Sequence, residues 1–479
     1  MGMKIPAELV DSGGNSLYAS ERKVYPRDVE GRFQRMRHLA VFVLLGMFYV
    51  FPWLRWGGRQ AVLFDLPARK FYIFGLNFWP QDFVFLAGLL VIAAMALFFF
   101  TALAGRLWCG YACPQTVWTE VFLWMERWTE GDRGRRMKLD AARWSRDKFV
   151  RKGAKHSLWL LFALWTGFTF VGFFTPITDL AARAPYGWGG WESFWVFFYA
   201  LATWGNAGFL REQVCKYMCP YARFQSAMFD RNTLIIAYDA MRGEPRGPRK
   251  RGLASVLERG RGLLAEPLAA FTPDPLGDCI DCTICVQVCP TGIDIRNGLQ
   301  YECIACGACI DACDTVMDKM GYPAGLILYA TQNAIDGKPT RIVRARIIVY
   351  ALLLLGLCIG WGWGVGNRSP LIAEALRDRN ALFQERADGS VENGYTLKIV
   401  NKTVEPRRYR VAVDAGAGIA LRGGERIVDA APEEVLELPL VLSAPSGVRG
   451  KQSISFTVST VGDDGASERV PSTFFGPLQ

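Results

Sequence analysis

Long apolar runs separated by polar, strongly basic loops dominate the chain up to about residue 366. A helix needs roughly 20 apolar residues to cross a bilayer. Five runs approach this length, and they occupy 39–56, 83–104, 157–176, 193–210 and 346–366. The fourth is short and carries Asn206. The pattern predicts a multidomain membrane protein with an α-helical transmembrane bundle of five spans.

After residue 367 the apolar runs give way to short stretches in which apolar and polar residues alternate. Such stretches occupy 396–400, 409–413, 435–442 and 453–458. Turn-forming residues such as Gly423 and Gly424 separate them. Alternating strands at nearly regular spacing predict an all-β immunoglobulin-like sandwich at 370–479. This segment has no cysteine, so it needs no disulfide to fold.

Lys and Arg are distributed unevenly among the loops. They are dense in the tail 1–38, in 106–156 and in 211–345, whereas 177–192 contains only Arg183. Cytoplasmic loops of membrane proteins carry such an excess. We therefore expect these three basic segments on the cytoplasmic side and, after an odd number of spans, 370–479 on the opposite side. The net charge of +10 follows from this distribution and indicates a membrane lipid partner, not a nucleic acid.

Two cysteine runs in the segment 276–320 each have the spacing C-x2-C-x2-C-x3-C. In bacterial ferredoxins three close cysteines of such a run hold one 4Fe-4S cluster and the fourth holds the other. One predicted ligand set is therefore Cys279, Cys282, Cys285 and Cys313, and the other is Cys303, Cys306, Cys309 and Cys289. Two other interpretations of these cysteines fit less well. A zinc ion usually takes its ligands from two separated pairs of cysteines, and disulfides are rare in cytoplasmic segments. Cys313 departs from the ferredoxin pattern because Asp314, not proline, follows it.

A second group of thiols lies at the predicted cytoplasmic ends of the second and fourth spans. The motif C-x3-C-P occurs there twice, and its cysteines are Cys109, Cys113, Cys215 and Cys219. The outer-loop stretches 65–69 and 179–183 also resemble each other, so 39–230 reads as two repeated hairpins. If a helix continues through each motif, i,i+4 spacing places both thiols on one face. These thiols could bind Cu(I), zinc or iron, form a dithiol/disulfide couple, or be buried structural cysteines.

The remaining features of the sequence say less about function. Residues 231–275 read as a linker, in which 252–265 forms either an amphipathic helix on the inner leaflet or a solvated tether. His38 and His156 are expected to be interface residues, with a bis-histidine haem, a metal or a quinone as alternatives, and Cys358 is expected to pack within its span. Nucleotide-binding and covalent-haem motifs are absent from the sequence, so the electron donor must be a separate molecule.

Together these features resemble the CcoG/FixG/RdxA family of cytochrome c oxidase accessory proteins over nearly the whole length. The first four spans, the thiol motifs and the ferredoxin segment also resemble NapH-type and NosR-type proteins, but the fifth span and outer β-domain favour the first family. The resemblance implies a protein of the bacterial inner membrane with a periplasmic C-terminal domain. It also implies two 4Fe-4S clusters at the eight ferredoxin cysteines.

The family resemblance further implies a cupric reductase that supplies Cu(I) for assembly of a cbb-type oxidase. The expected catalytic and copper-binding residues are then Cys109, Cys113, Cys215 and Cys219. Expected partners are a cytosolic or membrane electron donor, a copper chaperone or transporter, and oxidase assembly factors, with a homodimer left open. Two alternatives remain: a quinol-linked electron conduit and a non-enzymatic assembly scaffold.

Overall fold

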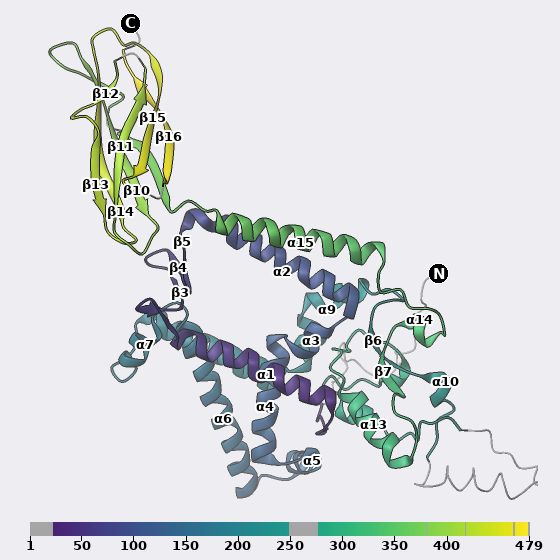
Figure 1. Ribbon diagram of the computed structural model, residues 1–479. Helices are drawn as coiled ribbons and strands as arrows, with labels where there is room; N and C mark the ends of the chain where they lie inside the picture. Colours follow the sequence, from purple (N-terminus) through teal and green to yellow (C-terminus); the bar gives the residue numbers. More distant parts are fainter. Residues whose placement is uncertain (1–22, 249–275, 380, 417, 463–464, 478–479) are drawn as a thin grey trace, which may run out of the picture. The chain divides into compact units, whose positions relative to one another are not determined.

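The computed structural model describes residues 23–248, 276–379, 381–416, 418–462 and 465–477 (Figure 1). The chain forms two compact units. The first combines Met1–Leu63 with Ala93–Leu354, and the second combines Phe64–Ile92 with Leu355–Gln479. The predicted helix at 252–265 lies outside the described residues.

Within the described ranges, three helices are long and apolar enough to cross a membrane. The first candidate is Arg32–Trp53, made of α1 (Arg32–Val50) and the short η1 (Phe51–Trp53). The second, Pro80–Ala104, joins η2 (Pro80–Asp82) to α2 (Phe83–Ala104), and the third is α15 (Ala345–Gly366). These correspond to the first, second and fifth predicted spans. The protein is therefore a candidate membrane protein, but the prediction of five spans is not confirmed.

The third and fourth predicted spans take a different form. The third falls in α6 (Arg146–Val171), whose first turns are strongly basic, and α7 (Ile177–Arg183) follows it. The fourth is divided between α8 (Gly190–Thr203) and the π-helix η3 (Trp204–Leu210). Helices α6 and α8 approach each other closely. A Cβ at Gly167 would lie only 2.3 Å from the carbonyl oxygen of Val196. Trp159 packs against η3, where a Cβ at Gly208 would lie 3.1 Å from the Trp159 ring.

Further helices of the first unit lie in the segments 107–141 and 214–227. They are α3 (Leu107–Tyr111), α4 (Pro114–Glu130), α5 (Arg133–Ala141), η4 (Val214–Met218) and α9 (Pro220–Ala227). Pro114 and Pro220 each occupy the first position of a helix, where the missing N–H costs nothing. The thiol motifs are therefore helix breaks. Cys113 and Cys219 are the N-cap residues that follow each break, so the i,i+4 arrangement on one helix face is wrong.

The ferredoxin segment is larger than its cysteine runs. It contains α12 (Ile284–Val288), η5 (Ile295–Asn297), α13 (Ala308–Met320) and α14 (Gln332–Ile335). Strand β6 (Ile235–Tyr238) pairs antiparallel with β7 (Ile327–Ala330), and α10 (Ala240–Gly243) follows β6. Residues 235–238 were expected in the linker, but they are a buried strand of this domain.

The second unit contains the predicted β-sandwich. One sheet has the order β12-β14-β10-β8, with β9 on β10, and the other has the order β13-β11-β15-β16. The long strands are β8 (Leu371–Arg377), β10 (Val391–Asn401), β11 (Arg407–Ala415), β14 (Val435–Ala444), β15 (Lys451–Thr460) and β16 (Ser467–Phe475). The shorter ones are β9 (Gln384–Glu385), β12 (Ala420–Leu421) and β13 (Arg426–Ala430). Inward residues such as Leu397, Tyr409 and Phe456 are fully buried between the sheets.

A small sheet before α2 was not predicted. The strands β1 (Arg55–Trp56) and β2 (Arg59–Gln60) form a hairpin. The strands β3 (Val62–Asp65), β4 (Lys70–Ile73) and β5 (Leu76–Phe78) form a three-stranded sheet. Within the second unit, Lys70 and Tyr72 of this sheet donate hydrogen bonds to Glu433 of the sandwich, at 2.9 and 2.8 Å. Within 65–69, Asp65 therefore ends β3 and 66–69 form a turn, whereas the similar 179–183 lies in helix α7.

Candidate functional site

The eight ferredoxin cysteines line two neighbouring cavities. Cys279, Cys282, Cys285 and Cys313 surround one. Cys289, Cys303, Cys306 and Cys309 surround the other, and Cys285 touches this cavity too. Each cavity therefore holds the four cysteines that the crossed ferredoxin pattern predicts for one cluster.

The loops around these cavities repeat a backbone conformation. Asp281 and Thr283 flank Cys282 with φ values of 51° and 56°. Ala305 and Gly307 flank Cys306 with φ values of 53° and 77°. Positive φ is unfavourable for residues other than glycine, and the surrounding structure must impose it. Both C-x2-C-x2-C loops therefore curl around their cavities in the same way.

The donor set fits 4Fe-4S clusters. The thiols lie in apolar surroundings, where burial raises the pKa of Cys303 and of Cys313 to about 12. Thiolates gathered in such a place need a cation, and iron bound by four thiolates supplies it. The apolar residues Ile236 and Leu326 line the cavities beside the cysteines. A shell of this kind limits solvent access, which influences the potential of a cluster.

The first thiol motif lies directly against the second cavity. Helix α3 carries Cys109, whose side chain packs with Ile304, Cys306 and Cys309 in one apolar cluster. At the next residue, a Cβ on Gly110 would lie 2.8 Å from the carbonyl oxygen of Ile304. The two backbones touch here, so only glycine fits at position 110.

Two hydrogen bonds hold the motif in place. The Tyr111 hydroxyl donates to the carbonyl of Cys306, at 3.2 Å. The Cys109 thiol donates to Oε1 of Gln225, also at 3.2 Å, and Gln225 is fully buried on α9. Because α9 follows Cys219, this bond joins the two thiol motifs. Neither Gly110 nor Gln225 stood out in the sequence, since nothing in a single chain marks a contact between segments so far apart.

The four motif thiols are electrostatic neighbours. Burial, together with the charges of Cys113, Cys215 and Cys219, raises the pKa of Cys109 to about 12. Burial, followed by the charges of Cys113 and Cys219, raises the pKa of Cys215 to about 11. Together with the bond between Cys109 and Gln225, these contributions indicate that the two C-x3-C-P motifs lie near each other. Among the described residues, no three Cys, His, Asp or Glu side chains are positioned to close on a single ion.

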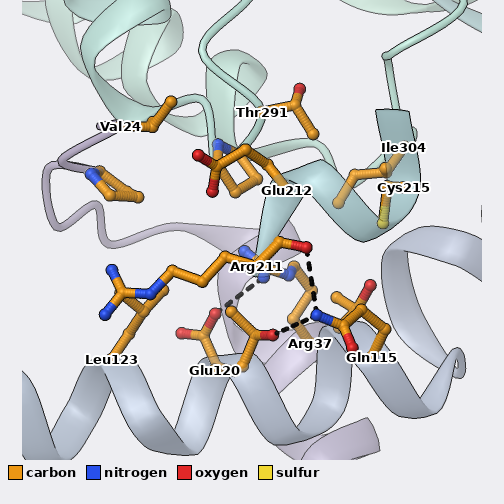
Figure 2. Close-up of a pocket in the computed structure, with 14 residues that line it drawn as sticks. Val24, Arg37, Gln115, Glu120, Leu123, Arg211, Glu212, Cys215, Thr291 and Ile304 are labelled. Atoms are coloured by element: carbon orange, nitrogen blue, oxygen red, sulfur yellow. Dashed lines mark hydrogen bonds and ion pairs between the residues drawn. The ribbon is translucent and has the colours of Figure 1, made fainter. Parts of the chain in front are cut away.

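A small cavity lies between the second motif and the ferredoxin domain (Figure 2). Cys215 lines it from η4, and Thr291 and Ile304 line it from the ferredoxin domain. Arg37 and Glu120 form a buried ion pair on its wall, with 2.8 Å between Nη2 and Oε2. Gln115 of α4 donates to the carbonyl of Arg211, at 3.1 Å, which fixes the turn before η4. Cys215 is therefore presented to a cavity that reaches the second ferredoxin loop.

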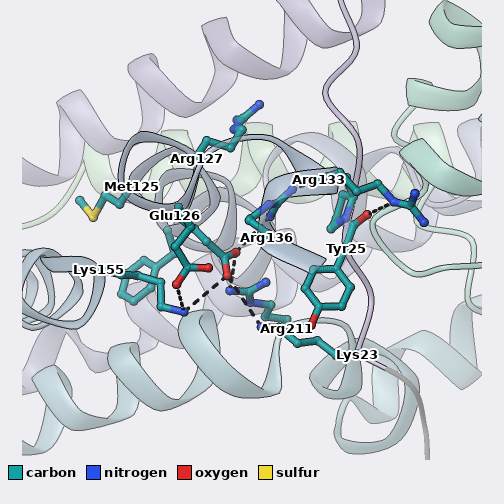
Figure 3. A network of polar contacts seen from close by, with 12 residues as sticks. Lys23, Tyr25, Met125, Glu126, Arg127, Arg133, Arg136, Lys155 and Arg211 are labelled. Atoms are coloured by element: carbon teal, nitrogen blue, oxygen red, sulfur yellow. Dashed lines mark hydrogen bonds and ion pairs between the residues drawn. The ribbon is translucent and has the colours of Figure 1, made fainter. Parts of the chain in front are cut away.

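A buried ionic network supports this turn from the other side (Figure 3). Glu126 of α4 is fully buried and pairs with Arg211 at 2.9 Å, Arg136 at 3.2 Å and Lys155 at 3.6 Å. Burial would raise the pKa of Glu126, but these cations lower it to about 2. The network joins α4, α5, α6 and the segment that carries Cys215.

The structure also shows the surroundings of the two histidines and of the remaining cysteine. The His38 ring lies 5.2 Å from that of Trp124 and 3.7 Å from Glu120. The His156 ring stacks on Phe209 at 5.7 Å. Each histidine therefore packs against aromatic side chains. Cys358 is exposed on α15, so the expectation that it packs within the span is wrong.

Family models match most of these parts. A model described as a 4Fe-4S dicluster domain matches residues 210–332, and one described as a 4Fe-4S binding domain matches 86–136. The Ig-like fold at the C-terminus of FixG matches residues 361–477. The crystal structure of a FixG-related protein from Vibrio parahaemolyticus is 31% identical, with a TM-score of 0.21, and covers 23% of this chain and all of that one.

Curated relatives match nearly the whole chain. The nitrogen fixation protein FixG of Rhizobium meliloti is 38% identical over 93% of this chain and 91% of its own length. Protein RdxB of Cereibacter sphaeroides is 41% identical over 86% of both chains. Protein RdxA of the same organism is 39% identical over 90% of this chain and 91% of its own. The chain therefore belongs to the FixG, RdxA and RdxB family of iron–sulfur proteins, consistent with a role in electron transfer.

Proposed function

We propose that the protein is a cupric reductase, in which Cu(II) is reduced at the C-x3-C-P thiols. The observation that carries this proposal is the contact between Gly110 and the loop that holds Cys306. It leaves no intervening side chain between the backbone beside Cys109 and the second ferredoxin cavity. Clusters bound in the two cavities supply one-electron transfer.

The reaction balances as a single electron transfer. Cu(II) gains one electron and becomes Cu(I), and the electron comes from an external donor by way of the ferredoxin cysteines. No proton or covalent bond needs to change on the copper. The residues of the chain keep the thiols and the cavities adjacent, through the Cys109–Gln225 and Tyr111–Cys306 hydrogen bonds.

The chemistry of the thiols supports copper as the substrate. Soft thiolates favour Cu(I) over harder ions, so the site stabilises the product of the reduction. Cu(I) is also satisfied by as few as two thiolates, which four neighbouring cysteines can provide. The Cu(I) would then serve assembly of a cbb-type oxidase, with the ferredoxin domain cytoplasmic and the β-sandwich periplasmic.

Replacement of single thiols tests the proposal. We expect Cys109→Ser and Cys215→Ser to abolish Cu(II) reduction by the dithionite-reduced protein, with iron content and cluster spectra unchanged. Cys358→Ser is the matched control, because this cysteine is exposed on α15 and should leave the rate as in the wild type. Normal copper reduction in both motif variants would refute the role of the thiols.

A further inference from the structure

A cavity lined by arginines lies where the segment before α1 meets α4, α5 and the ferredoxin domain. Its volume is about 320 Å³. The arginines that line it are Arg27, Arg127, Arg133 and Arg136, and the last three are labelled in Figure 3. Gln287 of α12 lines it from the ferredoxin domain. The cavity is separate from the thiols and from the two ferredoxin cavities.

The carboxylates that line this cavity already have partners. They are Asp28 and Asp132. Asp28 forms an ion pair with Arg127. Asp132 is the N-cap of α5, and its side chain accepts a hydrogen bond from the backbone N–H of Arg135, at 3.0 Å. The arginines of the cavity therefore outnumber the carboxylates that can neutralise them.

Two of the four arginines keep their charge unpaired. Neither Arg27 nor Arg133 forms an ion pair with another residue that the structure describes. Arg133 donates from Nε to the backbone carbonyl of Tyr25, at 2.9 Å, and its two terminal nitrogens are left for another acceptor. Arg133 also begins α5, and the first N–H groups of a helix have no partner within that helix.

Arg136 adds a buried donor beside the cavity. Only 1% of its surface is exposed, and its Nε has no hydrogen-bond partner among the described residues. Its other nitrogens are used, because Nη1 pairs with Glu126 at 3.2 Å and Nη2 donates to the carbonyl of Pro26 at 2.7 Å. A buried polar group without a partner costs free energy. The Arg136 Nε therefore calls for an acceptor at this place.

We propose that this cavity binds a phosphate group, which accepts hydrogen bonds from Arg27, Arg133 and Arg136. The planar guanidinium group of arginine matches two phosphate oxygens at once, and such charge-assisted bonds are strong. The phosphate supplies the negative charge that the carboxylates of the cavity do not. Two sources carry this group: the headgroup of an anionic phospholipid and a soluble phosphate ester.

The position of the cavity gives the phosphate a structural role. Gln287 lies between Cys285 and Cys289, which belong to different cluster ligand sets. Its carbonyl accepts a hydrogen bond from the backbone N–H of Arg27, at 2.8 Å. A phosphate held by Arg27 and by α5 therefore ties the ferredoxin domain to the helices of the first unit.

The affinity of the full-length, cluster-loaded protein for inorganic phosphate tests this site. Isothermal titration calorimetry in a maltoside detergent, which carries no phosphate, measures it at constant ionic strength. The titration needs neither copper nor electron transfer, so its outcome is independent of the proposed reductase activity. We expect saturable binding in the wild type. Arg27→Gln and Arg133→Gln each remove a charged donor and should weaken binding about tenfold.

Arg135→Gln is the matched control. Arg135 lies on the same helix as Arg133 and is exposed, but it does not line the cavity. The control loses the same charge, so it should bind phosphate as the wild type does. Arg133→Lys keeps the charge without the planar guanidinium group, and its affinity should lie between those of the wild type and Arg133→Gln. Iron content shows whether each variant has folded around its clusters.

Competition experiments identify the source of the phosphate. If the site takes a lipid headgroup, phosphatidylglycerol added to the detergent should weaken the apparent affinity for inorganic phosphate about tenfold. Competition by glycerol 3-phosphate alone would assign the site to a soluble ester. An iron-loaded wild type without saturable phosphate binding would overturn the proposal. Equal affinities in Arg27→Gln, Arg133→Gln and Arg135→Gln would overturn it too, because phosphate would then bind by net charge alone.

Discussion

Gly110 and Cys306 meet backbone to backbone, because a Cβ at Gly110 would lie 3.0 Å from the Cα of Cys306. This contact, the packing of Cys109 and the Tyr111 hydrogen bond hold helix α3 against the second ferredoxin loop. We expect Gly110→Ala to push the two segments apart, at a cost of about 1–3 kcal/mol in stability. Copper reduction should fall further than iron content, as measured by rate assays and iron analysis on the same sample.

Gly134→Ala is the matched control for this substitution. Gly134 also lies in a helix, α5, but a Cβ there would meet nothing within 4 Å. Alanine is favoured over glycine in a helix by up to ~1 kcal/mol, so this variant should be as stable as the wild type or more so. Equal behaviour of the two variants would contradict a close contact at Gly110.

The crossed assignment of cluster ligands makes a prediction for Cys289 and Cys313, the fourth cysteine of each run. Cys289 lines the cavity of Cys303, Cys306 and Cys309, although it follows the first cysteine run. We expect the electron paramagnetic resonance spectrum of Cys289→Ser to match that of Cys306→Ser. By the same reasoning, Cys313→Ser should match Cys282→Ser, because these cysteines share the other cavity. The opposite pairing of spectra would show that each run holds its own cluster.

Much of this site could be predicted from spacing alone. A C-x2-C-x2-C-x3-C run carries its cluster geometry in a few consecutive residues, and the alternation around Leu397 and Tyr409 identifies a sandwich strand in the same local way. The role of Gly110 and the bond between Cys109 and Gln225 join segments that are more than a hundred residues apart. A single sequence carries no sign of such pairs. Pro114 and Pro220 did carry a local signal, since proline is common at the first position of a helix.

Glu433 joins the small β3–β5 sheet to the sandwich within the second unit. It accepts hydrogen bonds from Tyr72 and Asn77 through its carboxylate and from Lys70 through its carbonyl. Its φ of 55° is unfavourable for glutamate, which shows that the turn is held by these contacts. We expect Glu433→Gln to weaken the attachment and to speed amide exchange at residues 70–78. Hydrogen–deuterium exchange mass spectrometry measures this directly.

Glu437→Gln provides the comparison for Glu433. Glu437 pairs with Lys398 at 2.7 Å on the outer surface of the sandwich, where more than half of its side chain is exposed. Exposed pairs contribute about 0–1 kcal/mol, so this variant should leave exchange at residues 70–78 unchanged. Equal protection of that segment in both variants would mean that Glu433 does not hold it.

Because of Glu126, the stability of the first unit should depend on pH in the acid range. Its pKa is lowered to about 2 by Arg211, Lys155 and Arg136, against the opposing effect of burial. A carboxylate with a depressed pKa contributes its full stability above its ordinary pKa of 4.5 and loses it as the pH falls towards 2. We therefore expect the thermal midpoint in detergent to fall over this interval, as followed by circular dichroism.

The variant Glu126→Gln separates this carboxylate from other acid effects. The neutral amide leaves Arg136, Arg211 and Lys155 buried without their counter-charge, which costs about 3–5 kcal/mol near neutral pH. The variant should also lose part of the acid dependence, since it has no carboxylate to protonate at this position. Asp147→Asn is the control, because Asp147 forms an exposed pair with Arg151. A similar loss of stability in both variants would show that burial of the network does not matter.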